Sequence, residues 1–435
     1  MQPTWRRRVL CFTLQLSCLT LLLAGCWDRN ELEQLAFVLT LGIDRSVDNQ
    51  IDVMLRVAVP VGVEAGPGKK AGGGTVSGTT KVLTVTARSV PEAISLAEAT
   101  IERQIDFRHL RIVVFGEQLA KEGLLPYLDV FERYHQFRRS TYIWIAKEGA
   151  ARHIFLTTDP VLEKSVSRYA EDLARLVPQL SFFRMATLHE FINETDSPQV
   201  DAVLPIVAVN PIVEREKKEN NNAPLPTDEY HQQLPENPEP GGKTLAPLYR
   251  SGGNPSEFLG VAVFHQGKLV DKWSGWETRD YSLLRDTYKR SIWVFPSPTG
   301  LGFFSLQLHR TRAPQITITD VNDVPHIDIA LSLEGNLLGI QSLEPYVSSD
   351  KIADLEAYAA GQIQSQIAAL IQKAQRQKVD PFYFVRFLRT KMLTMKELDE
   401  LNWREHFAQA TVTVAVDIKI RRPGLRIQPR ERETP

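Results

Sequence analysis

The fold of this chain starts after the stretch Leu21-Leu22-Leu23-Ala24-Gly25-Cys26-Trp27-Asp28-Arg29-Asn30-Glu31-Leu32, which separates a short leader from the rest of the protein. Upstream lie three consecutive arginines, Arg6 to Arg8, and then an apolar run from Val9 to Ala24. A basic start followed by a short apolar run is the layout of a secretory signal. The run is shorter than the roughly 20 residues that a membrane-spanning helix needs. Residues 1–25 are therefore predicted to be a signal peptide, so that the remainder folds outside the cytoplasm.

The end of the apolar run, Leu23-Ala24-Gly25-Cys26, resembles a bacterial lipobox. In lipoproteins with this box the cysteine sulfur receives a diacylglyceryl group, and cleavage leaves that cysteine as the first mature residue. The resemblance implies that Cys26 is the lipid attachment site, and that acyl chains such as palmitate hold the body on the membrane. Two chains anchor a protein stably where one does not. The alternative is an uncleaved anchor in which the cysteine has no role.

Length and composition limit the possible architectures and partners. A chain of 435 residues is too long for one core, so two or three domains are expected. Its 43% apolar and 24% charged residues are those of an ordinary folded protein. Loss of the leader would remove three arginines and no acids, which makes the net charge of −1 more negative and gives no attraction to nucleic acid. Only Cys26 of the 3 cysteines would remain, which excludes an intramolecular disulfide.

The N-terminal domain is predicted to span residues 26–210. Strands and helices intermix in it without a strict alternation, which favours an α+β fold with mixed sheets flanked by helices. The expected strands are 35–44, 51–59, 79–86, 111–115, 141–146 and 203–209, and the expected helices lie near 89–97, 124–137, 150–155, 161–176 and 188–194.

Residues 211–254 are rich in Pro, Asn and Gly and are predicted to be a flexible linker. A C-terminal α+β region should cover 255–425, with 255–345 and 346–425 as candidate subdomains and 426–435 as a tail. It is expected to begin with a hairpin, 258–264 and 268–273, that turns at Gln266-Gly267. The other expected elements are strands at 292–295, 303–308, 315–319, 327–333, 337–341 and 411–420, and one long helix at 350–378.

A second resemblance covers nearly the whole mature chain. Cys26-Trp27-Asp28-Arg29 leads to Glu31-Leu32 and then to Leu41-Gly42-Ile43-Asp44. Further segments come in order: Phe107 to Glu117, Ile143 to Lys147, Gly260 to Phe264 with Lys268 to Val270 and Trp276 to Asp280, Glu334 to Leu337, and Asp380-Pro381, Trp403 and Phe407 with Thr411 to Gly424. In this order behind a lipobox they resemble the Ger(x)C family, the C-subunit lipoproteins of nutrient germinant receptors in bacterial endospores. Two positions depart from the family: Asp280 stands where Gly is frequent, and Pro381-Phe382-Tyr383 replaces a Gly-Phe-Gly-like segment.

The resemblance implies a non-enzymatic subunit on the outer face of the spore inner membrane, held to the bilayer through Cys26. Its implied partners are a multi-spanning A-type and a transporter-like B-type membrane subunit, with which it triggers germination in sporulating bacteria. Individual motif residues have simpler structural interpretations. Gly116 and Gly335 would supply turns with positive φ, and Lys268 and Glu277 would form a surface ion pair beside a hairpin.

Catalytic signatures are absent from the sequence. The histidines show no metal-binding spacing, and no Gly-x-Ser-x-Gly elbow occurs. Gly242-Lys243-Thr244 lacks the first glycine of a phosphate loop, and no helix follows Gly66-x-Gly68, so both are coincidences of glycine-rich segments. We therefore expect no catalytic residues, metal or cofactor.

Two rival functions stay open. One is an extracytoplasmic solute-binding lipoprotein that captures the nutrient itself in a cleft between two similar lobes. The other is a lipid-anchored hydrolase of cell-wall or cortex turnover, which would need convergent acids or a metal site.

Overall fold

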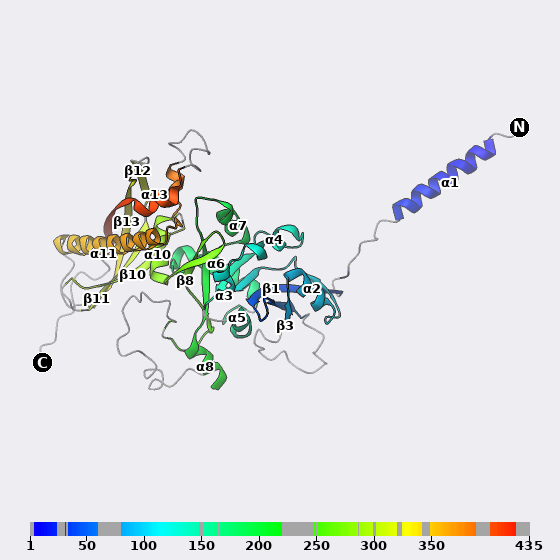
Figure 1. The fold of residues 1–435 in the computed structure, drawn as a ribbon, viewed down its shortest axis with the longest axis horizontal. Coiled ribbons are helices and arrows are strands. Elements are labelled where there is room, and N and C mark those ends of the chain that lie inside the picture. The colour runs from blue at the N-terminus through cyan, green and yellow to red at the C-terminus, as the bar shows by residue number, and fades with distance from the viewer. Residues whose placement is uncertain are drawn as a thin grey trace.

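The computed structural model describes residues 4–23, 31, 34–59, 80–147, 151–163, 165–219, 248, 250–285, 287–298, 302–319, 324–341, 349–388 and 401–422. Two β-sheets with covering helices form the body, and the leader helix α1 (Thr4–Leu23) stands apart from it (Figure 1). This confirms the predicted multidomain α+β fold.

Among the described residues, the N-terminal sheet has nine strands. They are β1 (Leu35–Arg45), β2 (Ile51–Ala58), β3 (Thr80–Ala87), β4 (Gln104–Asp106), β5 (Ile112–Gly116), β6 (Tyr142–Ala146), β7 (Ala202–Val209), β8 (Ser256–His265) and β9 (Lys268–Trp273). Their order is β3-β2-β1-β5-β6-β7-β8-β9, with β4 beside β1. Pairing is parallel from β1 through β5 and β6 to β7, and antiparallel at both ends of the sheet.

Helices cover both faces of this sheet, which is why its central strands read as continuous apolar runs. One face packs on α2 (Val90–Glu98), α3 (Glu117–Glu122), α4 (Leu125–Arg133) and α7 (Leu188–Asp196). The opposite face packs on α5 (Ala151–Thr157) and α6 (Val166–Leu180). In β5, Val113 and Phe115 point to the first set and Ile112 and Val114 to the second. The Ser89 side chain caps α2 by accepting a hydrogen bond from the Glu92 amide.

The predicted domain boundary at residue 255 does not match the sheets. The hairpin β8–β9 forms as expected, with positive φ at Gln266 and Gly267. However, β8 pairs antiparallel with β7, so the hairpin completes the N-terminal sheet. The crossing to the second sheet comes afterwards, through α10 (Gly275–Leu284).

Part of the predicted linker is a helix, α8 (Pro211–Glu219). The Asn210 side chain accepts hydrogen bonds from the amides of Ile212 and Val213, and proline occupies the first helical position. The linker prediction is thus wrong for 211–219, where this Asn-Pro pair was the available signal. Residues 220–247 lie outside the described part of the chain.

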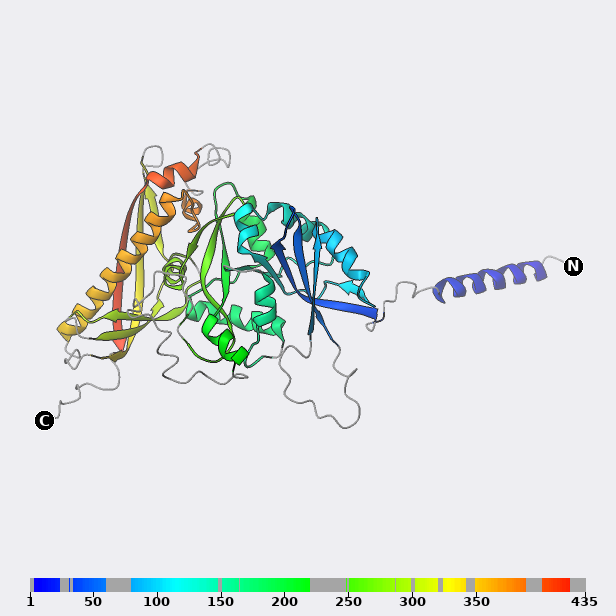
Figure 2. The ribbon, with the colours of Figure 1, turned by 60° about the horizontal axis from the view of Figure 1, so that its bottom comes forward.

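In the part of the chain that the structure describes, the C-terminal sheet has five strands: β10 (Arg290–Pro296), β11 (Phe303–Arg310), β12 (Gln315–Thr319), β13 (His326–Ile340) and β14 (Thr411–Arg422). The predicted strands 327–333 and 337–341 are one strand, β13. Because β14 pairs in parallel with β13 along most of its length, 255–345 and 346–425 are not separate subdomains. The long helix α11 (Ser349–Arg376), predicted as 350–378, lies along this sheet (Figure 2).

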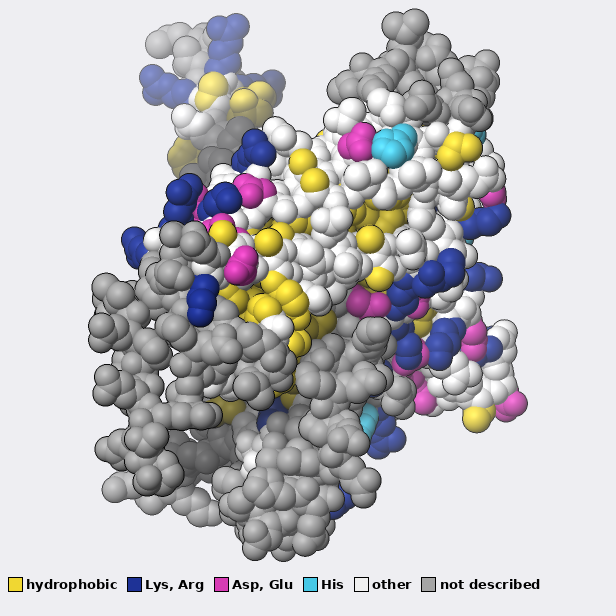
Figure 3. All heavy atoms as spheres, turned by 90° about the vertical axis from the view of Figure 1, so that its left-hand side faces the viewer, with side chains coloured by type: hydrophobic (Ala, Val, Ile, Leu, Met, Phe, Trp, Pro, Cys, Tyr) yellow, Lys and Arg dark blue, Asp and Glu magenta, His cyan; other side chains and the backbone are white. Residues whose placement is uncertain are grey.

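One face of this sheet is buried against α11 and the other is open. Along β10 buried and exposed residues alternate, with Trp293 and Phe295 inside and Ile292 and Val294 outside. Figure 3 looks onto this end of the molecule, where apolar side chains show near the middle and Lys and Arg gather toward the sides. One buried cluster continues from Val203 and Trp273 of the first sheet through α10 into the second, so part of the core is common to both sheets.

Candidate functional site at the joint between the sheets

The predicted lipid attachment residue, Cys26, lies outside the described residues, as do Ala24 and Gly25. The helix α1 ends just before them, at Leu23. Within the described part of the chain, no helix is both long and apolar enough to cross a membrane.

Two motif residues, an acid and a glycine, meet at one place in the N-terminal sheet. The Asp44 carboxylate accepts from the amides of Ala151 at 2.6 Å and Arg152 at 3.2 Å, which fixes the start of α5. A Cβ on Gly116 would lie 2.3 Å from Asp44 Oδ1, and φ at Gly116 is −66°. Gly116 therefore provides space for Asp44, and its predicted turn with positive φ is wrong.

The prediction of a turn with positive φ is also wrong for Gly335, in the second sheet. It lies inside β13, and a Cβ there would be 2.9 Å from Leu308 Cδ2 on the neighbouring strand. Close side-chain approach, rather than backbone conformation, explains this glycine.

The helix α10 carries the motif Trp276 to Asp280 and is buried on nearly every side although its sequence is polar. The Ser274 side chain and Glu277 form a capping box at its start. The residues buried along it are Gly275, Thr278, Arg279, Asp280, Tyr281, Ser282, Leu283 and Leu284. Polar residues are seldom buried without a specific reason, so this helix is the first candidate for a functional element.

Two adjacent residues of α10 carry opposite buried charges. The Arg279 guanidinium lies 3.4 Å from the centroid of the Trp293 ring and donates from Nη1 to the Ile292 carbonyl at 3.1 Å. Burial lowers the pKa of Arg279 to about 10 and raises the pKa of Asp280 to about 7. Arg279 Nε and Asp280 Oδ1 have no hydrogen-bond partner among the described residues. Both residues line a pocket of about 770 Å³ between α10, β10 and α11.

Glu277 joins α10 to α11. Its carboxylate accepts from Lys373 Nζ at 3.0 Å, and Lys373 also lies 3.5 Å from Asp271. The predicted ion pair between Lys268 and Glu277 is therefore wrong, because Glu277 binds Lys373 instead. On the neighbouring β9, Lys272 donates to the motif residue Glu117 of α3 at 2.8 Å.

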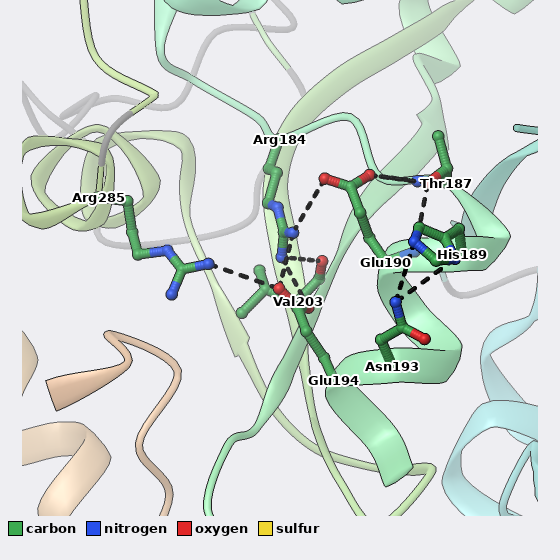
Figure 4. A network of polar contacts seen from close by, with 8 residues as sticks. All are labelled: Arg184, Thr187, His189, Glu190, Asn193, Glu194, Val203 and Arg285. Carbon is green, nitrogen blue, oxygen red and sulfur yellow. Dashed lines mark hydrogen bonds and ion pairs between the residues drawn. The ribbon is translucent and has the colours of Figure 1, made fainter. Parts of the chain in front are cut away.

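A cluster of charged residues around the buried Arg184 links the N-terminal sheet to the residue that follows α10 (Figure 4). We call Arg184, Glu190, Glu194 and Arg285 the Arg184 cluster. Arg184 donates to both Glu194 oxygens at 2.9 and 3.0 Å and to the Val203 carbonyl at 3.1 Å, and Arg285 approaches Glu194 at 3.5 Å. Burial acts to lower the pKa of Arg184, but the carboxylates of Glu194 and Glu190 outweigh it and raise that pKa.

A second cluster joins the end of β8 to the C-terminal helices. The Asp201 carboxylate contacts His265 Nδ1 at 2.9 Å, Arg404 Nη2 at 2.9 Å and the Asp380 amide at 2.7 Å. The Asp380 carboxylate accepts from Trp403 Nε1 at 2.7 Å, and burial raises its pKa to about 6. The motif pair Asp380-Pro381 thus ties the segment after α11 to the first sheet.

The contacts at the joint between the sheets have a structural role. They fix two sheets relative to each other through paired charges from segments far apart in sequence. In the residues described, no three His, Cys, Asp or Glu side chains gather closely enough to hold a metal ion. Sequence reasoning did not find Arg184, Asp201 or Arg404, because each is an isolated polar residue whose partners lie elsewhere in the chain.

Comparison with known proteins gives a consistent result. Residues 28–209 match the model of the spore germination protein N-terminal domain, and residues 259–424 match the spore germination B3/GerAC-like C-terminal model. Spore germination protein KC of Bacillus subtilis (strain 168) is 22% identical over 94% of this chain and 94% of its own length. Spore germination protein GerQC of Bacillus cereus is 18% identical over 81% of this chain and 85% of its own.

Among solved structures, the crystal structure of the GerBC protein is similar, with a TM-score of 0.49 and 16% identity over 88% of this chain and 96% of that one. The two family models follow each other in order and together cover most of the chain. The motifs that suggested the family lie within the matched ranges or directly beside them. The chain therefore belongs to the Ger(x)C family of spore germination proteins.

Proposed function

We propose that this chain is the lipid-anchored, non-enzymatic C-type subunit of a nutrient germinant receptor. The observation that carries the proposal is the match of both family domains, 28–209 and 259–424, directly behind the lipobox that ends at Cys26. The protein would act by binding membrane partners, the A-type and B-type subunits, and so help to commit the spore to germination.

The anchor supplies the first half of this role. Acyl chains on Cys26 would keep the body at the outer face of the spore inner membrane. Confinement to that surface raises the effective concentration of the body near membrane partners without any new contact.

The joint between the two sheets supports the other part of this role, the binding of partners. Arg285, which donates to Glu194 in the Arg184 cluster, and Arg404, which donates to Asp201, connect the two sheets through charge-assisted hydrogen bonds, which are stronger than neutral ones. A body held in this way presents its two sheets to a partner in one fixed arrangement.

The substitution Cys26→Ala tests the anchor. It should leave the circular dichroism spectrum and thermal unfolding of the body unchanged, release the protein from spore membranes, and weaken co-purification with A-type and B-type subunits. Cys11→Ala, in the leader, is the matched control and should change none of these. Full membrane retention together with normal nutrient-induced germination in Cys26→Ala would contradict the proposal.

The nutrient-capturing alternative is not favoured. A cleft between two similar lobes would need two similar sheets. The two sheets formed by the described residues differ, since one has nine strands and the other has five. Calorimetry of the full chain with amino acids and sugars should show no saturable heat, and a saturable signal would reopen that alternative.

A further inference from the structure

A second pocket, of about 820 Å³, opens on the N-terminal sheet between β2, β3, α5 and α8. It lies apart from the joint between the sheets and from both of its charged clusters. Four cationic residues line it, Arg56, Lys81, Lys217 and Lys218, against two carboxylates, Asp159 and Glu214. Its volume is in the range of small-molecule sites, roughly 300–1,000 Å³. We call it the Arg56 pocket.

Arg56 is a buried cation without an acidic partner. Only 5% of the residue is exposed. Its Nη2 donates to the Phe155 carbonyl, and its guanidinium carbon lies 5.6 Å from the centroid of the Phe155 ring. No carboxylate in the described part of the chain pairs with it, and burial alone lowers the pKa of Arg56.

The two carboxylates of the pocket are already paired with other cations. Asp159 lies 2.5 Å from Lys217 Nζ. Glu214 lies 2.9 Å from His153 Nε2 and 2.7 Å from Lys218 Nζ. The charge of Arg56 is therefore not balanced within the pocket, and the lining as a whole carries excess positive charge.

Close packing around Phe155 fixes the position of Arg56. A Cβ on Gly42 would lie 2.9 Å from Phe155 Cε2, so this glycine lets the Phe155 ring pack directly on β1. Asp44 fixes the start of the helix that carries Phe155, and Gly116 leaves room for Asp44. The glycines and the acid of two motif segments thus determine where Phe155, and with it the guanidinium, lies.

Burial of an ion without its partner costs several kcal/mol, which a bound anion would offset. A guanidinium offers a planar fork that fits the oxygens of phosphate, and a phosphate carries enough charge to meet several cations. The pocket is much larger than a free phosphate ion. We propose that the Arg56 pocket binds the phosphate group of an organic molecule, with the Arg56 guanidinium as its buried contact and Lys81 as a second, exposed contact.

The phosphate could belong to a soluble phosphate ester or to a phospholipid headgroup, and two probes separate these sources. The detergent-solubilised full chain is titrated by calorimetry with sn-glycerol 3-phosphate and with monomeric dihexanoyl phosphatidylglycerol. Chloride keeps the ionic strength constant, because screening alone changes charge interactions. We expect saturable binding of at least one probe. Binding of both assigns the recognition to the phosphate, and binding of the lipid alone assigns it to a headgroup with its glycerol and chains.

Arg56→Gln should weaken this binding at least tenfold. Arg88→Gln, which removes an arginine from the same domain at a side chain that is 81% exposed, should leave it unchanged. Lys81→Gln serves as the second variant if Arg56→Gln does not fold, and should weaken binding severalfold. Saturable binding of neither probe, or equal binding by wild type and the folded variants, would overturn the proposal. None of these results depends on the lipid anchor.

Discussion

Two arginines buried in this protein have opposite surroundings. In the Arg184 cluster the guanidinium meets two oxygens of Glu194 and a backbone carbonyl, and its pKa is raised. In the Arg56 pocket the guanidinium meets a backbone carbonyl and an aromatic ring, and its pKa is lowered. The two arginines are almost equally buried, with 7% of Arg184 and 5% of Arg56 exposed, yet their surroundings suit different roles. A buried charge with its partner holds structure together, and one without a partner is suited to receive a ligand.

The largest effect should come from breaking the paired site. Arg184→Met removes the main cation from Glu194, whose side chain is only 17% exposed. Removal of one member of a buried ion pair costs about 3–5 kcal/mol. Urea unfolding should show a loss of this size in the free energy of unfolding.

The matched control for this change is Arg175→Met. Arg175 pairs with Asp172 on the surface of α6, and its side chain is 73% exposed. Exposed pairs contribute roughly 0–1 kcal/mol, so this variant should unfold close to the wild type. Equal losses in the two variants would mean that the paired charges of the Arg184 cluster do not stabilise the fold.

The buried carboxylate of Asp280 extends this comparison. The positive charge of Arg279 offsets only part of the cost of burying the negative charge of Asp280. Its folded pKa of about 7 lies above the ordinary value of 3.8, so the native state binds a proton that the unfolded state has lost. The native state therefore favours the protonated carboxyl. The stability that goes with this protonated form is fully present below the unfolded pKa and is lost as pH rises through the folded pKa of about 7. Asp280→Asn should therefore be more stable than the wild type at pH 8 by up to about 4 kcal/mol, because each of the roughly three pKa units corresponds to about 1.4 kcal/mol.

The pH dependence identifies the cause. The difference between Asp280→Asn and the wild type should shrink as pH falls from 8 toward 5, because the wild-type carboxyl becomes neutral as well. Thermal unfolding across this range measures it. A difference that stays constant with pH would point to packing rather than to the charge of Asp280.

The sequence predicted the elements of the fold better than the way they combine. The hairpin β8–β9 was found because alternating strands flank Gln266-Gly267, a local signal. Its membership in the first sheet depends on pairing with β7 across the segment that was predicted as a linker. Local patterns do not encode such pairing, so the sequence did not predict that the hairpin belongs to the first sheet.

The two arginine sites were beyond sequence reasoning for related reasons. Arg56 lies in an alternating strand, at a position that such a pattern assigns to the solvent side, yet α5 covers that face as well. Arg184 shares the Glu194 carboxylate with Arg285, which lies 91 positions beyond Glu194 in the sequence. In contrast, the motif glycines were recognised correctly as special, and only the reason was missed. Space for a neighbouring side chain, unlike a positive φ, depends on tertiary contacts.

The smallest expected effect on stability is also the one that best separates the two kinds of arginine. Arg56→Met removes an unbalanced charge and replaces it with an apolar side chain of similar length. Replacement of a buried ion by a packed apolar residue is often neutral or stabilising. Without ligand, the free energy of unfolding should therefore stay within about 1 kcal/mol of the wild type or rise, although Arg56 is as buried as Arg184.

Urea unfolding measures this effect, first without ligand and then with whichever of the two phosphate probes binds. That probe should stabilise the wild type and leave Arg56→Met unaffected, since a ligand stabilises only the state that binds it. A loss as large as that of Arg184→Met, in the absence of ligand, would show that Arg56 is a structural residue whose partner is already in place.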